Sequence, residues 1–218
     1  ANTRVWWLWI RTSPSILASA PTASVPRPAP ATPSASAGAW VAMAMTSSSG
    51  RPNSRNFDSV VGMSSRFAAA VTCGLLRIQS ELGVEGPIAE IGTFEGRFFI
   101  AMAHALEGGE RALGMDVFDW PNPQVIDRFE ANCARHGVPA ERRITWKVDS
   151  GRTRPEELLA KLGGERVRLF HIDGEHSRAA LSRDLELATA VLGKGGVLVL
   201  DDMLHPGYPT LMVAVQDY

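Results

Sequence analysis

The sequence predicts an α/β fold built on a doubly wound, mainly parallel sheet. Short continuous apolar runs, typical of strands that are buried on both faces, alternate with amphipathic segments at helical spacing. Glycines follow several of the helical segments, as they commonly do at helix C-termini. Parallel strands need right-handed crossover connections, so ligands are expected at the carboxyl ends of the strands, near the switch in strand order.

The elements are expected in the following order. A first helix covers residues 59–82 and ends at Gly83, a C-cap. Five strands follow at residues 87–91, 112–115, 144–148, 167–172 and 197–200, the last entered through Gly195-Gly196. The four helices between them are expected at residues 95–106, 123–136, 155–162 and 177–192, and another helix begins near residue 209.

Residues 1–57 differ from the rest, because they are rich in Ala, Ser, Pro and Thr and contain five arginines but no acidic residue. Such a segment buries too little apolar surface to offset its ordering entropy, so we expect it to be disordered. Three interpretations stay open: a transit peptide, a short signal around VWWLWI, or an over-extended reading frame whose true start is Met43 or Met45. We therefore expect a disordered or mis-annotated extension over residues 1–57 and one domain over residues 58–218.

Charge and cysteine usage restrict the partners. All 23 acidic residues but only part of the 22 basic ones lie after residue 57, so the domain is acidic, which argues against nucleic acid. No apolar run approaches the roughly 20 residues of a membrane span. Cys73 and Cys133 lack the spacing of a zinc site. We expect a cytoplasmic protein with a small-molecule partner, no nucleic acid and no membrane, and leave homo-oligomerisation open.

The predicted strand ends carry the candidate binding residues. Glu90-Ile91-Gly92-Thr93-Phe94-Glu95-Gly96 follows the first strand, with two glycines where backbone must approach a ligand closely. This motif is neither GxGxxG nor GxxxxGK[ST], which disfavours a diphosphate ligand. Asp116 ends the second strand, where an acid can accept both hydroxyls of a ribose. Asp149-Ser150 follows the third strand and could meet an adenine amino group, or could be a plain turn.

Three carboxylates are expected to converge after the fourth and fifth strands. His171-Ile172-Asp173-Gly174-Glu175-His176 follows one, and Asp201-Asp202 the other. Like charges at close quarters repel, so such a cluster usually holds a cation or shares protons. Oxygen ligands suit Mg²⁺ or another hard divalent ion, and His176 lies near enough in sequence to act as a general base.

The segments IAEIGTFEGR, FHIDGEHS and LGKGGVLVLDD resemble the class I S-adenosylmethionine-dependent methyltransferases. More narrowly, the sequence from about Phe57 onward is similar to the group of macrocin O-methyltransferases and cephalosporin-hydroxylase-like enzymes. The resemblance implies a Rossmann-like sheet of strand order 3-2-1-4-5 and S-adenosylmethionine as cofactor, with Mg²⁺ in metal-dependent members. The family's sheet normally ends with strands 6 and 7, but only residues 203–218 follow Asp202, so the domain is expected to be truncated.

The resemblance also implies roles for individual residues. The cofactor-binding set is Glu90, Gly92, Thr93, Gly96, Asp116, Asp149 and Ser150. The metal set is Asp173, Asp201 and Asp202, and the catalytic set is His176 and Asp173. The implied reaction is methyl transfer to a hydroxyl of a small molecule or sugar. Two rivals remain: a truncated, inactive cofactor-binding module, and a nicotinamide-dependent oxidoreductase, against which the missing GxGxxG argues.

Overall fold

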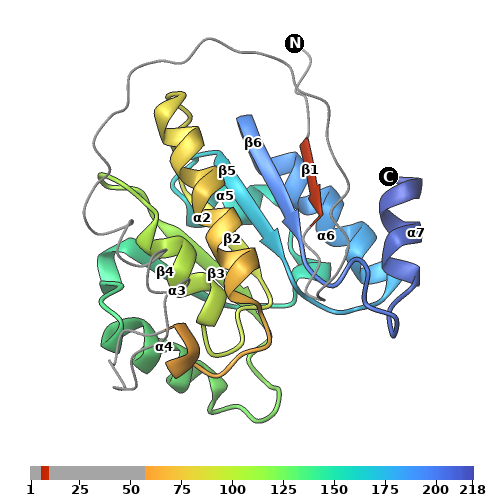
Figure 1. The fold of residues 1–218 in the computed structure, drawn as a ribbon, viewed down its shortest axis with the longest axis horizontal. Helices are drawn as coiled ribbons and strands as arrows, with labels where there is room; N and C mark the ends of the chain where they lie inside the picture. The colour runs from red at the N-terminus through yellow and green to blue at the C-terminus, as the bar shows by residue number, and fades with distance from the viewer. Residues whose placement is uncertain (1–5, 10–56) are drawn as a thin grey trace.

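The computed structural model describes residues 6–9 and 57–218, which form a parallel sheet between two helical layers (Figure 1). The strands are β1 (Trp6–Trp9), β2 (Ile88–Ile91), β3 (Ala112–Asp116), β4 (Arg143–Lys147), β5 (Val167–Ile172) and β6 (Leu192–Leu200). The α-helices are α2 (Arg66–Glu81), α3 (Arg97–His104), α4 (Val125–Arg135), α5 (Pro155–Lys161), α6 (Arg178–Val191) and α7 (Thr210–Asp217). Short 3-10 turns lie at η1 (Phe57–Ser59), η2 (Ala140–Arg142) and η3 (Ser150–Arg152).

The sheet order is β1-β6-β5-β2-β3-β4, and every neighbouring pair is parallel. The five strands from β2 onward therefore have the order 3-2-1-4-5, which confirms the predicted doubly wound, Rossmann-like fold. The switch in strand order lies between β2 and β5, so the turns after these two strands flank the expected ligand site.

Two apolar cores cover the two faces of the sheet. Helices α2, α3 and α4 pack on one face through residues such as Leu76, Phe99 and Phe129. Helices α5, α6 and α7 pack on the other through residues such as Leu158 and Leu185. The buried strands supply apolar side chains to both cores, which is why they read in the sequence as continuous apolar runs.

Helix α2 begins at Arg66, seven residues after the predicted start of the first helix. The reason is local: the Ser65 side chain accepts a hydrogen bond from the Ala68 N–H at 3.0 Å and caps the helix there. The chain before it is held in another conformation, because Arg97 Nε donates to the Val60 carbonyl at 2.7 Å. Phe57 is fully buried and packs in the core with α2 and α3.

Strand β1 was not predicted. It pairs with β6 from Trp6 opposite Val197 to Trp9 opposite Leu200, at one edge of the sheet (Figure 1). The expectation that residues 1–57 are disordered is therefore wrong for Trp6–Trp9, whose aromatic residues favour strands. The remaining residues of that segment, including Met43 and Met45, lie outside the described residues, and the interpretations of the segment stay predictions.

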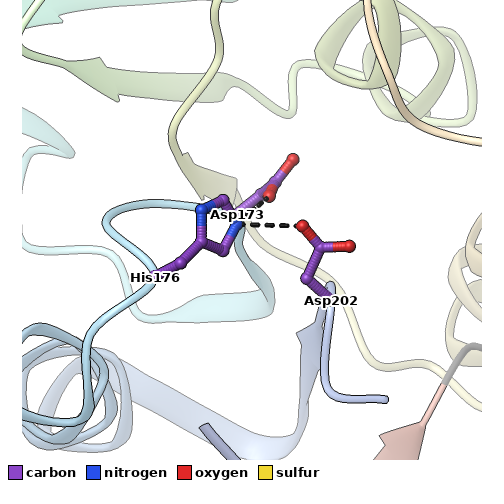
Figure 2. Close-up of side chains that lie close together, drawn as sticks. All are labelled: Asp173, His176 and Asp202. Carbon is purple, nitrogen blue, oxygen red and sulfur yellow. Dashed lines mark ion pairs between the residues drawn. The ribbon is translucent and has the colours of Figure 1, made fainter. Parts of the chain in front are cut away.

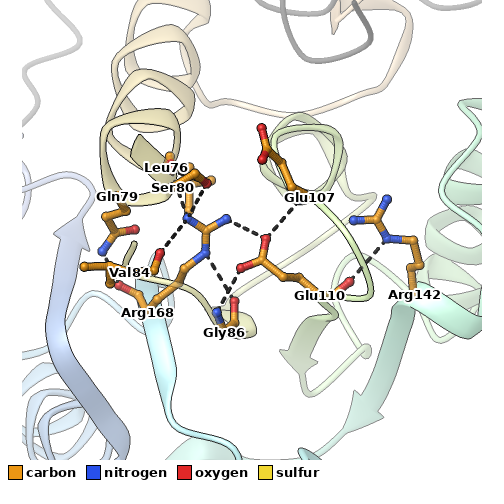
Figure 3. A network of polar contacts seen from close by, with 9 residues as sticks. All are labelled: Leu76, Gln79, Ser80, Val84, Gly86, Glu107, Glu110, Arg142 and Arg168. Atoms are coloured by element: carbon orange, nitrogen blue, oxygen red, sulfur yellow. Dashed lines mark hydrogen bonds and ion pairs between the residues drawn. The ribbon is translucent and has the colours of Figure 1, made fainter. Parts of the chain in front are cut away.

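A buried ion pair closes the amino end of the sheet (Figure 3). The Arg168 side chain is 1% exposed, and its Nη2 donates to Glu110 Oε2 at 2.6 Å. Its Nη1 donates to the Leu76 carbonyl of α2 at 2.9 Å, and Glu110 Oε1 accepts from the Gly86 N–H at 2.9 Å. A buried charge is tolerated where its donors are satisfied, so this network ties β5, α2 and the approach to β3 together.

Candidate active site

The turn between β2 and α3 contains the two glycines that the sequence singled out. Gly92 has φ +84°, and a Cβ there would lie 1.9 Å from the Asp173 carbonyl oxygen. Gly96 has φ +91° and precedes the first residue of α3, and its Cβ would lie 3.0 Å from the Phe129 ring. Both positions therefore need glycine for backbone conformation and for packing within the protein itself. These contacts explain both glycines within the protein, and the close approach of a ligand to this turn stays a prediction.

Asp116 ends β3, and two backbone amides orient its side chain. Oδ2 accepts from the Phe94 N–H at 2.9 Å, and Oδ1 accepts from the Phe118 N–H at 2.7 Å. Both phenylalanines have positive φ, 49° and 47°, a conformation that non-glycine residues adopt at a cost. Each carboxylate oxygen keeps a second lone pair, so the half-buried side chain can still accept hydrogen bonds from vicinal hydroxyls.

Glu90 lies in β2 beside a histidine that the sequence analysis did not select. Glu90 Oε1 and His171 Nδ1 are 2.7 Å apart, both side chains are almost fully buried, and Phe98 stacks on the imidazole at 4.1 Å. Burial raises the pKa of Glu90 to about 7, and its hydrogen bond holds the pKa of His171 above the ordinary value despite burial. His171 lies opposite Glu90 in the pairing of β2 with β5. Its role could be predicted from the sequence only if that strand pairing were known.

Two buried oxygen atoms near this pair have no hydrogen-bond partner among the described residues. They are Glu90 Oε2 and Thr93 Oγ1. A buried polar atom without a partner is costly unless a ligand or water completes it. Glu90 Oε2 is an acceptor, so it fits a donor group such as an ammonium, and Thr93 Oγ1 can donate or accept.

The residues after β4 have mostly local partners. Asp149 is exposed, and its Oδ1 accepts from the Gly151 N–H at 2.9 Å, which caps the η3 turn. Ser150 hydrogen-bonds Asp184, a buried residue of α6 that the sequence analysis missed. Burial raises the pKa of Asp184 to about 6. Ser150, one of the two residues predicted after this strand, therefore connects η3 to α6.

Asp173, His176 and Asp202 come together at the carboxyl ends of β5 and β6 (Figure 2). One ligand atom from each lies within 4.8 Å of the others. His176 Nε2 is 3.0 Å from Asp202 Oδ2 and 3.6 Å from Asp173 Oδ1, and it is a buried atom with no well-aligned hydrogen-bond partner in the described part of the chain. Asp202 has φ +55°.

Asp201 does not join this group. Its Oδ1 accepts a hydrogen bond from the Asp202 N–H at 2.9 Å, so its carboxylate caps the backbone turn. The predicted convergence of three carboxylates is corrected to two carboxylates and one imidazole. The physical reason is the alternation of side chains, since consecutive residues leaving a strand point in different directions.

The charges in the cluster favour a cation. Burial, followed by the nearby Asp201 and Asp202 carboxylates, raises the pKa of Asp173. Asp173, and then Asp202 and Asp201, hold the pKa of His176 above its ordinary value. Two carboxylates and an imidazole with an unsatisfied nitrogen are a donor set that a divalent ion accepts.

The contact at Gly92 joins the two halves of the site. The turn after β2 touches the Asp173 backbone, and the Asp173 N–H donates to the Ile91 carbonyl at 2.9 Å. The candidate cofactor residues and the acidic cluster are therefore neighbours at one edge of the sheet. None of the helices in the described ranges is long and apolar enough to cross a membrane.

The strand order and the acids at the strand ends define a Rossmann-like α/β domain with a polar site at its switch point. Residues 89–203, just over half of the chain, match the family model described as a methyltransferase domain. The chain belongs to this methyltransferase family, as its motifs predicted. The matched segment contains every predicted site residue.

Solved structures of O-methyltransferases share the fold. The TDP-rhamnose 3'-O-methyltransferase CalS11 is 22% identical, with 70% of this chain and 69% of that chain covered and a TM-score of 0.54. The O-methyltransferase NovP is 14% identical, with 71% of each chain covered and a TM-score of 0.60. TomG from Streptomyces achromogenes is 20% identical, with 72% and 69% covered and a TM-score of 0.51. No curated protein matches the sequence.

Proposed function

We propose that this chain is an S-adenosylmethionine-dependent O-methyltransferase that acts on a hydroxyl of a small molecule or sugar with the help of a divalent cation. The observation that carries the proposal is the cluster of Asp173, His176 and Asp202 beside the Gly92 turn. Three proteins of similar fold support the proposal further. CalS11 is a TDP-rhamnose 3'-O-methyltransferase, NovP is an O-methyltransferase, and TomG is an O-methyltransferase with a structure in complex with S-adenosylmethionine.

The residues around β2 and β3 fit the cofactor. Glu90 Oε2 is a buried acceptor without a partner, which suits the ammonium of the methionine part. Asp116 is oriented by the Phe94 and Phe118 amides and suits the ribose hydroxyls. The sulfonium supplies an electrophilic methyl group, so the protein has to position two molecules and remove one proton.

The cluster fits a cation and a base. Asp173 and Asp202 would hold the ion, which would lower the pKa of a hydroxyl bound to it. His176 Nε2 would accept the hydroxyl proton. The acceptor oxygen would then bond to the methyl carbon as the carbon–sulfur bond breaks, with the electron pair left on the sulfur of S-adenosylhomocysteine. In this assignment the carboxylates bind the ion, and the imidazole acts as the general base of the same reaction.

Binding is the first test. Calorimetry on the full chain should detect S-adenosylhomocysteine, and Asp116→Asn should weaken it by about 10-fold or more, because amide groups replace a double acceptor. Glu165→Gln, an exposed change at the opposite end of β5, is the control and should leave the affinity unchanged. Equal affinity in Asp116→Asn and the control would contradict the assigned cofactor site.

The roles of the cluster can be separated with Mn²⁺ as a probe. Asp202→Asn should weaken Mn²⁺ binding and abolish divalent-dependent methyl transfer to TDP-rhamnose or a catechol, the first acceptors to test. His176→Gln should lower the rate while Mn²⁺ affinity is kept, if His176 is the base. Loss of Mn²⁺ in His176→Gln would make His176 a metal ligand. Full transfer in excess chelator would refute metal assistance, and cofactor binding without transfer to any acceptor would favour an inactive binding module.

A further inference from the structure

Three aromatic rings form a continuous stack beside the acidic cluster. The His176 and Tyr208 rings have centroids 4.3 Å apart and planes only 9° apart. His205 also stacks on Tyr208, with ring centroids 4.6 Å apart and planes 26° apart. His205 is exposed and His176 is half-buried, so the stack runs from solvent to the cluster.

The Tyr208 ring is attached to a firmly held part of the backbone. The Tyr208 N–H donates to the His205 carbonyl at 3.0 Å, and the Tyr208 carbonyl accepts from the Leu211 N–H at 3.1 Å, at the start of α7. Helix α7 packs on α6 through the buried Leu211 and Ala214. The backbone of Tyr208 is therefore anchored in the turn that leads into α7.

The His176 ring is otherwise held through Nε2, which lies 3.0 Å from Asp202 Oδ2 and 3.6 Å from Asp173 Oδ1. Its residue lies between β5 and Ser177, the N-cap of α6, and its Nε2 has no aligned hydrogen bond in the described structure. An imidazole can rotate about its terminal side-chain torsion at low cost. A flat ring at 4.3 Å opposes that rotation, since a turned imidazole would collide with the phenol or lose the stacking contact.

We propose that Tyr208 is a positioning residue that fixes the ring plane of His176 and so keeps Nε2 directed at the edge between Asp173 and Asp202. This inference rests on the proposed function, in which His176 takes the acceptor proton. Because Tyr208 covers one face of the imidazole, the acceptor cannot approach from that face. The phenol acts through its ring and not through its hydroxyl.

The first experiment needs neither substrate nor metal. A ring stacked on a phenol carries a ring-current shift, so the carbon-bound protons of His176 should resonate upfield in two-dimensional NMR of the full chain. The chain has five histidines, and His176→Gln and His205→Gln spectra assign the two signals. Tyr208→Phe should keep the upfield shift, while Tyr208→Leu should remove it. An unshifted His176 signal in the wild type, or an unchanged one in Tyr208→Leu, would overturn the proposal.

The second experiment uses turnover. Tyr208→Leu should lower kcat about 10- to 100-fold, the range expected for a small misplacement of a reacting group, with little change in S-adenosylhomocysteine affinity. Tyr208→Phe should restore the rate to near the wild-type value. Val215→Ala, which loosens α7 packing without touching the stack, should lower the melting temperature and keep both the NMR shift and kcat.

The outcomes separate the two proposals. An equal loss of kcat in Tyr208→Phe and Tyr208→Leu would assign the effect to the hydroxyl and overturn positioning by stacking. A loss in Val215→Ala that matches Tyr208→Leu would reduce Tyr208 to a structural role. An inactive wild type with the NMR pattern intact would contradict the methyltransferase activity and leave the ring-fixing role standing.

Discussion

Gly92→Ala is the substitution whose cost can be worked out most directly from the structure. The new Cβ would lie 1.9 Å from the Asp173 carbonyl oxygen, about 1.1 Å inside the closest approach that Cβ atoms tolerate, so the ends of β2 and β5 must separate. Forced separation of packed groups costs about 1–3 kcal/mol. The left-handed backbone at φ +84° adds about 1–2 kcal/mol. We expect a loss of about 2–5 kcal/mol and a fall in melting temperature of about 4–20 °C for a chain of this size.

Gly137→Ala is the matched control, because Gly137 has a similar φ of +78° but no atom within 4 Å of its would-be Cβ. Gly137→Ala should lower the free energy of unfolding only by the cost of the left-handed backbone, about 1–2 kcal/mol. Urea unfolding of the two variants and the wild type measures both values. Gly92→Ala should also weaken Mn²⁺ binding, since Asp173 moves. Equal free energies of unfolding for the two variants would refute the argument that the β2 turn and Asp173 are in steric contact.

Three further changes test other parts of the molecule. Glu110→Gln should cost about 3–5 kcal/mol in denaturant unfolding, because Arg168 stays buried without a counter-charge, whereas Glu165→Gln at an exposed ion pair should cost under about 1 kcal/mol; similar values would contradict this. Because the pKa of Glu90 is raised to about 7, stability should fall as the pH rises from about 4.5 through 7, and Glu90→Gln should flatten the melting temperature between pH 5 and 8; an unchanged slope would count against it. Since burial raises the pKa of Asp184 to about 6, Asp184→Asn should raise the melting temperature at pH 8 but hardly at pH 5, and a larger gain at pH 5 would show the sign to be wrong.

The strands and helices were predictable from local patterns, whereas the order of the strands in the sheet was implied by the family resemblance. Buried parallel strands are apolar throughout, and the segments between them have helical spacing, so strands and helices could be assigned by periodicity. Two features escaped this reasoning. The start of α2 is set by a cap at Ser65 and by a contact between Arg97 and Val60, which lie far apart in sequence. Strand β1 depends on pairing with β6, and a short aromatic run alone does not predict that pairing.

The candidate site was predictable only where function follows from a position at a strand end. Asp173 and Asp202 were found in this way, and the structure joins them to His176. His171 and Tyr208 were missed, because their roles depend on the register opposite Glu90 and on the docking of α7. Such contacts join residues that are distant in the chain, and no spacing rule within one segment reveals them.

The left-handed residues Phe94, Phe118 and Asp202 all lie at the carboxyl edge of the sheet, beside the candidate site. Each holds conformational energy that glycine would release. At Phe118 the loss of a fully buried side chain outweighs this release, whereas at the half-buried Asp202 glycine would remove little packing. Glycine at position 202 would, however, remove one of the two carboxylates of the acidic cluster. Selection for heat resistance alone would therefore favour glycine at Asp202, and a stabilised descendant with this change would keep the sheet while losing part of its site.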